Sequence, residues 1–127
     1  MKIASLKFSD KKKPSFYDVK VDDMGDVRYY NKKGQPHRLD GPAIEMANGY
    51  KAWYVNGKLH REDGPAIEWP DGGRSWYVNG KRHRIDGPAI EWPEGTKWWF
   101  VNGKLVGTSK EGFTEEDFKQ WKKEHGL

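Results

Sequence analysis

Hydrophobic and polar positions recur in the same order three times along this chain, at a constant interval of 23 residues. Residues 37–59, 60–82 and 83–105 align without insertion or deletion, and each opens with His-Arg-x-Asp-Gly-Pro-Ala-Ile-Glu. An interval of this length is typical of arrays in which each repeat is one supersecondary unit that contacts only its neighbours. The pattern therefore predicts a stack of three equivalent units.

Within a unit, the pattern predicts one β-hairpin and a connector. In the second unit, residues 66–69 alternate small, apolar, acidic and aromatic side chains, which is the period of a strand with one buried face. Residues 70–73 predict a turn, and residues 74–78 predict the return strand because aromatic and β-branched residues dominate them. The Asn-Gly pair at 79–80 is the strongest short signal for a tight hairpin turn. We therefore predict a mainly β fold, an elongated antiparallel meander of stacked β-hairpin repeats.

The segment before the repeats, residues 1–36, is predicted to be an N-terminal β cap that covers one edge of the sheet. Its pattern is a degenerate version of the unit, with Tyr30 at the position of Trp53 and Gly34 at the position of Gly57. Strand is predicted at residues 3–8, 15–17, 19–21 and 27–30.

The segment after the repeats, residues 106–127, is predicted to be a C-terminal capping α-helix. Thr114 is the predicted N-cap, and Asp117 occupies the third helical position of a capping box. Phe118 and Trp121 share one face, and a helix this short needs a surface to dock on. We expect the helix to cover the last hairpin, so that the chain forms a single domain, whereas a partner-binding helix is the alternative.

Composition narrows the class of protein. The chain has 127 residues, the size of one domain, and only 35% of them are hydrophobic, so large aromatic rings must supply much of the core. The absence of cysteine excludes disulfides, a thiol nucleophile and a Cys-based zinc site. The first residues contain no apolar run typical of a signal peptide, and no segment has the length and apolarity of a membrane span. We therefore expect a cytoplasmic protein without a cofactor.

The net charge of +4 is concentrated before the repeats. Residues 1–36 carry nine Lys or Arg and five Asp or Glu, whereas the repeats carry ten and nine. A repeat surface that bound nucleic acid would be expected to show a basic stripe. The run Lys11-Lys12-Lys13 is expected to be a solvated loop, with contact to an acidic partner or anionic lipid as the alternative.

The His-Arg-x-Asp motif is the first candidate for chemistry. Three identical copies argue against catalysis, because an active site needs residues with distinct roles and no Ser or Cys recurs with them. The three histidines, one per unit, are predicted to lie too far apart to share a metal ion. Two interpretations remain: the arginines pair with Asp across neighbouring units, or they form a ladder that binds phosphates or carboxylates. The candidate binding residues of this motif are Arg38, Arg61, Arg84, His37, His60 and His83.

The aromatic pairs are the second candidate. Adjacent residues in a strand point to opposite faces, so each Trp-Tyr or Trp-Phe pair places one ring on either side of the sheet. One ring of each pair is expected in the core, and the other either rigidifies the sheet or forms a binding surface for proteins or stacked bases. The candidates for that binding ring are Tyr54, Tyr77 and Phe100.

The repeat resembles a known family. The 23-residue period, the Asn-Gly-Lys-Arg-His stretch at 79–83 and the Glu-Gly-Thr-Lys stretch at 94–97 look like MORN repeats, over about residues 30–105. A MORN unit usually has Gly-x-Gly after its Asn-Gly-Lys turn, where this chain has His-Arg-x-Asp-Gly-Pro-Ala, a spelling that resembles repeat proteins of bacteriophages. The resemblance implies a β-hairpin array used for binding, and for a phage protein it implies a host factor as the target, in the host cytoplasm.

We therefore expect a non-enzymatic binding protein that presents its repeat surface to a protein partner. The alternative is the binding of an anionic small molecule, such as a nucleotide, or of nucleic acid through the Arg and aromatic ladder.

Overall fold

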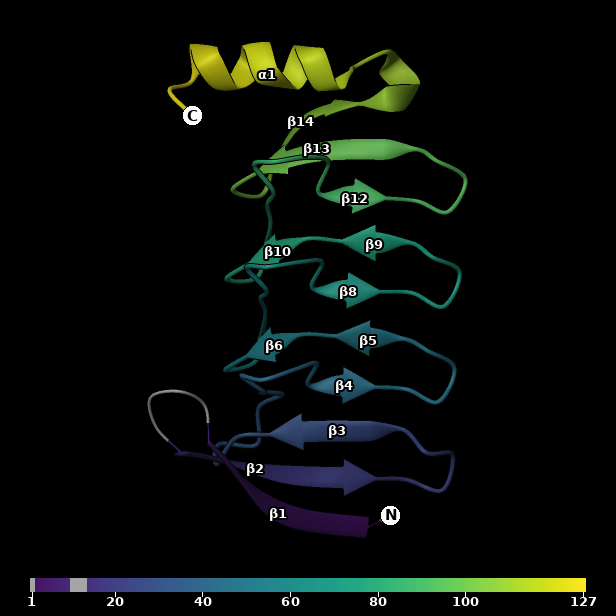
Figure 1. Cartoon of the computed structure of the whole chain (residues 1–127), viewed down its shortest axis with the longest axis vertical. Helices are drawn as coiled ribbons and strands as arrows, with labels where there is room; N and C mark the ends of the chain where they lie inside the picture. The colour runs from purple at the N-terminus through teal and green to yellow at the C-terminus, as the bar shows by residue number, and fades with distance from the viewer. Residues whose placement is uncertain (1, 10–13) are drawn as a thin grey trace.

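Strands from the cap and from every repeat join one sheet that runs the length of the molecule, with a helix at its far end (Figure 1). The computed structural model describes residues 2–9 and 14–127, so the Lys11-Lys12-Lys13 run lies outside the described residues. In spatial order the ten strands of the sheet are β1 (Lys2–Ser9), β2 (Pro14–Val21), β3 (Val27–Tyr30), β4 (Ile44–Glu45), β5 (Lys51–Ala52), β8 (Ile67–Glu68), β9 (Arg74–Ser75), β12 (Ile90–Glu91), β13 (Lys97–Val101) and β14 (Lys104–Thr108).

Neighbouring strands of this sheet are antiparallel throughout, which confirms the predicted meander of hairpins. The first two repeats each add a small two-stranded sheet outside it. These small sheets pair β6 (Tyr54–Val55) with β7 (Lys58–Leu59) and β10 (Tyr77–Val78) with β11 (Lys81–Arg82). A short 3-10 helix, η1 (Ser109–Glu111), and the helix α1 (Glu115–Glu124) follow the last strand.

The Asn-Gly pairs form the tight turns predicted for them. Asn56 and Gly57 have φ angles of 48° and 82°, and the other two units repeat this geometry. A two-residue hairpin loop of this type needs positive φ at both central residues, which Asn and Gly tolerate better than other residues. The turns therefore explain why both residues recur in every unit.

Small residues sit where one unit crosses the next. The three alanines of the Gly-Pro-Ala motif, Ala43, Ala66 and Ala89, are 0% exposed. Each of their carbonyls accepts a hydrogen bond from the backbone N–H of an aromatic residue, at 2.7–2.8 Å. A larger side chain would find no space at this close approach of two backbones, because protein interiors are packed to crystal density.

The cap departs from the predicted register by one residue. Tyr29, and not Tyr30, occupies the position of Trp53: its N–H donates to Ala43 and its carbonyl accepts from His37, just as Trp53 contacts the next unit. The prediction for Tyr30 is wrong because the turn at residues 31–35 is one residue longer than the Asn-Gly turn of the repeats. The predicted strands of the cap are otherwise present in β1, β2 and β3.

The third unit ends differently because no fourth unit follows it. Val106 and Gly107 stand where His and Arg would begin a fourth unit, so the chain stays in the main sheet and β14 pairs with β13 along its length, apart from one bulge. The helix then begins where predicted. The Thr114 side chain accepts from the backbone N–H of Asp117, and the Asp117 side chain accepts from the N–H of Thr114, which completes the capping box.

The helix docks on the last hairpin through its aromatic face. Phe118 is 2% exposed and forms one cluster with Trp99 and Val101, against which Phe113 and Trp121 also pack. The expectation of a helix that covers the end of the array is therefore confirmed. Among the described residues, no helix is long and apolar enough to cross a membrane.

Replacement of Phe118 by Ala is expected to lower the free energy of unfolding by about 3–5 kcal/mol, because a buried aromatic side chain leaves a cavity. Lys119→Ala is the matched control, since Lys119 follows directly but its side chain is 69% exposed. Its effect should stay within about 0.5 kcal/mol. Urea unfolding of both variants measures the difference, and equal effects would show that the helix does not depend on this contact.

Candidate binding grooves

The connector arginine of each unit has the same set of contacts. Arg61 donates from Nε to Asp63 at 3.1 Å, and from Nη1 to the Pro65 carbonyl at 3.0 Å and to Glu68 at 3.3 Å. Its guanidinium carbon lies 3.9 Å from the ring centroid of Trp53, which belongs to the preceding unit. Cation–π stacking of this kind strengthens as the pair is withdrawn from water. The arginine therefore ties its own connector to the unit before it.

The other two arginines repeat these contacts. Arg84 binds Asp86, the Pro88 carbonyl and Glu91, and lies 3.8 Å from the Trp76 centroid. Arg38 makes the corresponding hydrogen bonds in the first unit and lies 4.0 Å from the Tyr29 centroid in the cap.

Glycine covers the guanidinium of every connector arginine. A Cβ added at Gly64 would lie 2.8 Å from Cζ of Arg61, which is closer than it would come to Nε or Nη1, so the approach is over the face of the group. The corresponding distances at Gly41 and Gly87 are 3.0 and 2.8 Å. Each guanidinium is thus held between an aromatic ring and a glycine. The glycine of the motif is needed for space, because none of the three has a positive φ.

These contacts revise one interpretation of the motif and weaken the other. The arginines pair with the Asp two residues ahead in the same unit, so the prediction of Arg–Asp pairs across neighbouring units is wrong. The arginine contacts the preceding unit through its stack on the aromatic ring instead. Because each arginine also has a Glu within 3.5 Å, its charge is compensated within the unit.

The histidines support the Asn-Gly turns. Nδ1 of His37, His60 and His83 accepts the backbone N–H of the turn asparagine of the same unit, at 2.9, 3.0 and 2.9 Å. Each bond ties the turn to a histidine 19 residues earlier in the chain, and a hydrogen bond of this kind contributes about 1 kcal/mol to stability. In His37, burial lowers the pKa of the imidazole below its usual 6.5, in keeping with a neutral ring that accepts a hydrogen bond.

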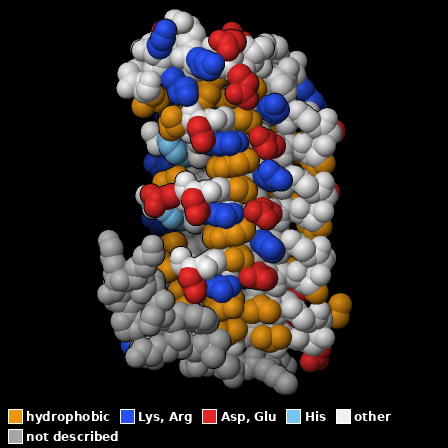
Figure 2. Space-filling view, viewed as in Figure 1, with side chains coloured by type: hydrophobic (Ala, Val, Ile, Leu, Met, Phe, Trp, Pro, Cys, Tyr) orange, Lys and Arg blue, Asp and Glu red, His pale blue; other side chains and the backbone are white. Residues whose placement is uncertain are grey.

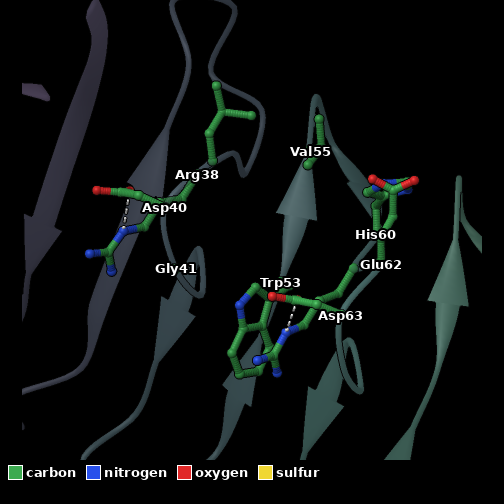
Figure 3. Close-up of a pocket in the computed structure, with 10 residues that line it drawn as sticks. Arg38, Asp40, Gly41, Trp53, Val55, His60, Glu62 and Asp63 are labelled. Atoms are coloured by element: carbon green, nitrogen blue, oxygen red, sulfur yellow. Dashed lines mark hydrogen bonds and ion pairs between the residues drawn. The ribbon is translucent and has the colours of Figure 1, made fainter. Parts of the chain in front are cut away.

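Two equivalent grooves open between successive connectors. Groove 1 has a volume of about 720 Å³ and is lined by residues 38–41, Trp53, Val55 and residues 60–63. Groove 2 has a volume of about 660 Å³ and is lined by residues 61–64, Trp76, Val78 and residues 83–86. The two lining sets differ by 23 positions throughout. Figure 3 shows the walls of groove 1, with Trp53 and Val55 between the connector of Arg38 and Asp40 and the connector of His60 and Asp63.

The face around the grooves carries a regular charge pattern. Across the short strands, Glu45 lies opposite Lys51, Lys51 opposite Glu68, and Glu68 opposite Arg74, and the alternation continues through Glu91 to Lys97. Figure 2 shows the resulting columns, in which Lys and Arg side chains are flanked by acidic ones over a hydrophobic layer. Opposite charges in cross-strand positions stabilise a sheet modestly. The arrangement also explains why the repeats are nearly neutral.

The second set of candidate rings lies outside both grooves. Tyr54 and Tyr77 are half-buried and belong to neither lining. Burial raises the pKa of the nearby Tyr50 phenol, and the Tyr54 and Tyr77 phenols raise it further. Phe100 is 6% exposed and belongs to a core cluster, so the expectation of a binding ring is wrong at this position. The reason is Trp98, which stands where the first unit has Ala52 and stacks on Phe100 at a centroid distance of 6.2 Å.

The structure also adds residues that the sequence did not single out. Trp53 and Trp76 form the floors of the grooves, although alternation alone did not show which ring of each pair would face the core. Leu39, Glu62 and Ile85 occupy the variable position of the motif: Leu39 and Glu62 line groove 1, and Glu62 and Ile85 line groove 2. A signal for these residues was present in the repeat itself, because the x of His-Arg-x-Asp is the one position that varies inside an otherwise fixed motif.

Among the residues that the structure describes, no group of three or more His, Cys, Asp or Glu could hold a metal ion. Comparison with protein-family models, with curated proteins and with solved structures finds no match to the chain.

Gly64→Ala is expected to destabilise the protein by about 1–3 kcal/mol, because the added methyl group displaces the Arg61 guanidinium from the Trp53 ring. In an Arg61→Ala background the same change should cost less than about 0.5 kcal/mol, since the obstructing group is gone. Urea unfolding of the wild type, both single variants and the double variant measures this coupling. An equal cost in both backgrounds would show that the glycine has another role.

Stability is also expected to depend on the protonation of His37. Because the pKa is lower in the folded state than in the unfolded chain, the unfolded state binds the proton more readily. The contribution of His37 is therefore fully present above about pH 6.5 and is lost as the pH falls through the folded pKa. Between pH 7.5 and pH 5.0, the urea midpoint of unfolding should fall further for the wild type than for His37→Gln, whose side chain at this position cannot titrate. Identical falls would contradict this prediction.

Proposed function

We propose that this chain is a non-enzymatic binding protein that docks a protein partner on its groove face, defined as grooves 1 and 2 with the charged strands beside them. The observation that carries the proposal is the repetition of one open groove at a 23-residue interval. Both grooves have an aromatic floor and arginine at the walls. Aromatic residues and arginine are enriched at the centres of protein interfaces, where they contribute much of the binding energy.

The repetition also supports binding over catalysis. Grooves 1 and 2 present the same residue types in the same geometry, and their candidate acids and bases have structural partners. The imidazole Nδ1 atoms accept from turn amides, and the aspartates accept from arginine Nε. General acid–base catalysis requires groups that are free to exchange a proton with a substrate.

The binding of an anionic ligand by an arginine ladder has weaker support. Arg61 and Arg84 each contact one Asp and one Glu, so an incoming phosphate would compete with two carboxylates. Titration with nucleotides and short oligonucleotides at low salt tests this alternative. Saturable binding that is lost in an Arg38/Arg61/Arg84→Ala triple variant with an unchanged melting temperature would favour it. A host protein as the partner, and a location in the host cytoplasm, follow from the resemblance to phage repeat proteins and not from the groove geometry.

A Leu39→Glu/Glu62→Arg double variant is expected to reduce capture of the partner at least tenfold, as truncation of a central interface contact does. Both side chains are exposed, Leu39 at 44% and the Glu62 side chain at 83%, so the fold should be retained, which a melting curve checks. The control is Trp69→Ser, at an exposed aromatic residue outside both grooves.

The measurement is quantitative pull-down with mass spectrometry, followed by titration of the identified partner. Loss of capture in Trp69→Ser and not in the groove variant would contradict the proposal and place the interface elsewhere.

A further inference from the structure

The seat of helix α1 is a third groove of the same series. The residues of the sheet and connector that pack against the helix cluster are Ile85, Trp99, Val101 and Val106. A shift of 23 positions gives Glu62, Trp76, Val78 and His83, and all four line groove 2. A shift of 46 positions gives Leu39, Trp53, Val55 and His60, and all four line groove 1. Helix α1 therefore fills the third groove, whereas the two equivalent grooves of the earlier units stay open.

One substitution in the repeat explains why the third groove differs. Gly107 stands where the earlier units have Arg61 and Arg84, so the guanidinium of those units has no counterpart at this position. Phe113 takes that place: its ring centroid lies 5.2 Å from that of Trp99, and a Cβ on Gly107 would lie 2.4 Å from the Phe113 ring. In grooves 1 and 2 the arginine already covers the Trp. In the third groove Phe118 lies beside Phe113, with its ring centroid 6.4 Å from that of Trp99, and Trp121 stacks on Phe118.

Polar groups at the mouths of the grooves fit the same kind of ligand. Lys122, one turn beyond Phe118, donates from Nζ to the Ile85 carbonyl at 2.8 Å. The mouths of the open grooves carry Glu62, Asp63 and Asp86, whose side chains are 83%, 89% and 87% exposed. Exposed carboxylates attract a cationic segment and orient it on approach.

We propose that grooves 1 and 2 bind an amphipathic α-helix of a partner protein, with large apolar side chains at i and i+3 and a lysine or arginine at i+4, as Phe118, Trp121 and Lys122 present them. Recognition of a helix through such anchors is a recurring mode of protein binding. Leu39 and Glu62 line groove 1, and Glu62 and Ile85 line groove 2, so each groove offers one aliphatic side chain and one carboxylate from the variable positions of the motif. The inference rests on the proposed function, since it names the kind of partner.

The probe is a peptide of residues 114–127 held helical by a lactam between Glu116 and a lysine in place of Gln120. Both positions are exposed in the helix, so the bridge leaves the docking face free. Backbone amide NMR of the full-length protein, titrated with this peptide, should show saturable shifts at Leu39, Val55 and His60. Leu39→Glu should weaken binding about tenfold, because burial of a leucine side chain is lost.

A peptide that also carries Phe118→Ala and Trp121→Ala keeps the charges and should not bind. Three results would overturn the inference: no shifts in groove 1 with millimolar peptide, shifts that Leu39→Glu leaves unchanged, or shifts confined to Trp99 and Val101, which would show mere exchange with α1. If the peptide fails while the groove variant still abolishes partner capture, the proposed function stands and the partner presents something other than a helix. If the groove variant has no effect on capture either, the proposed function fails with it.

Discussion

The stacking of each connector arginine on the aromatic ring of the preceding unit joins successive connectors, alongside the strand pairing that joins the units in the sheet. A guanidinium can lie 3.8–4.0 Å from that ring only if its other face meets a residue without a side chain, and this requirement fixes the glycine. The proline carbonyl, the Asp and the Glu then orient the guanidinium, while the neighbouring His holds the tight turn. Most fixed positions of the motif thus serve one contact, which joins a unit to the one before it.

Local chemistry explains which parts of the fold could be predicted. The turns at Asn56-Gly57 and the capping box at Thr114 depend on residues close in sequence, and both are present as predicted. The register of the cap was missed by one residue, because it depends on the length of a single irregular turn. The partners of Arg61 were missed for a related reason: a Glu seven residues ahead comes near only after the connector has folded back on its strand.

The candidate site was predictable in part. The motif arginines and histidines do cluster, yet most of their polar atoms hold the units together, so the surface open to a partner lies beside them. Alternation places adjacent rings on opposite faces of a sheet, but it does not show which face the next connector will cover. That choice follows from the path of the connector, which crosses Trp53 and Trp76 and leaves Tyr54 and Tyr77 on the other side.

The replacement of one arginine by Gly107 decides where the array ends. Each earlier connector stacks on the unit before it, and helix α1 occupies the groove that lacks the arginine. An additional 23-residue unit inserted before the third one would therefore lengthen the molecule and add one more open groove, without altering the terminus. Valency in such a protein is a property of repeat number, and overall avidity for a partner with several matching segments would rise with each copy through effective concentration.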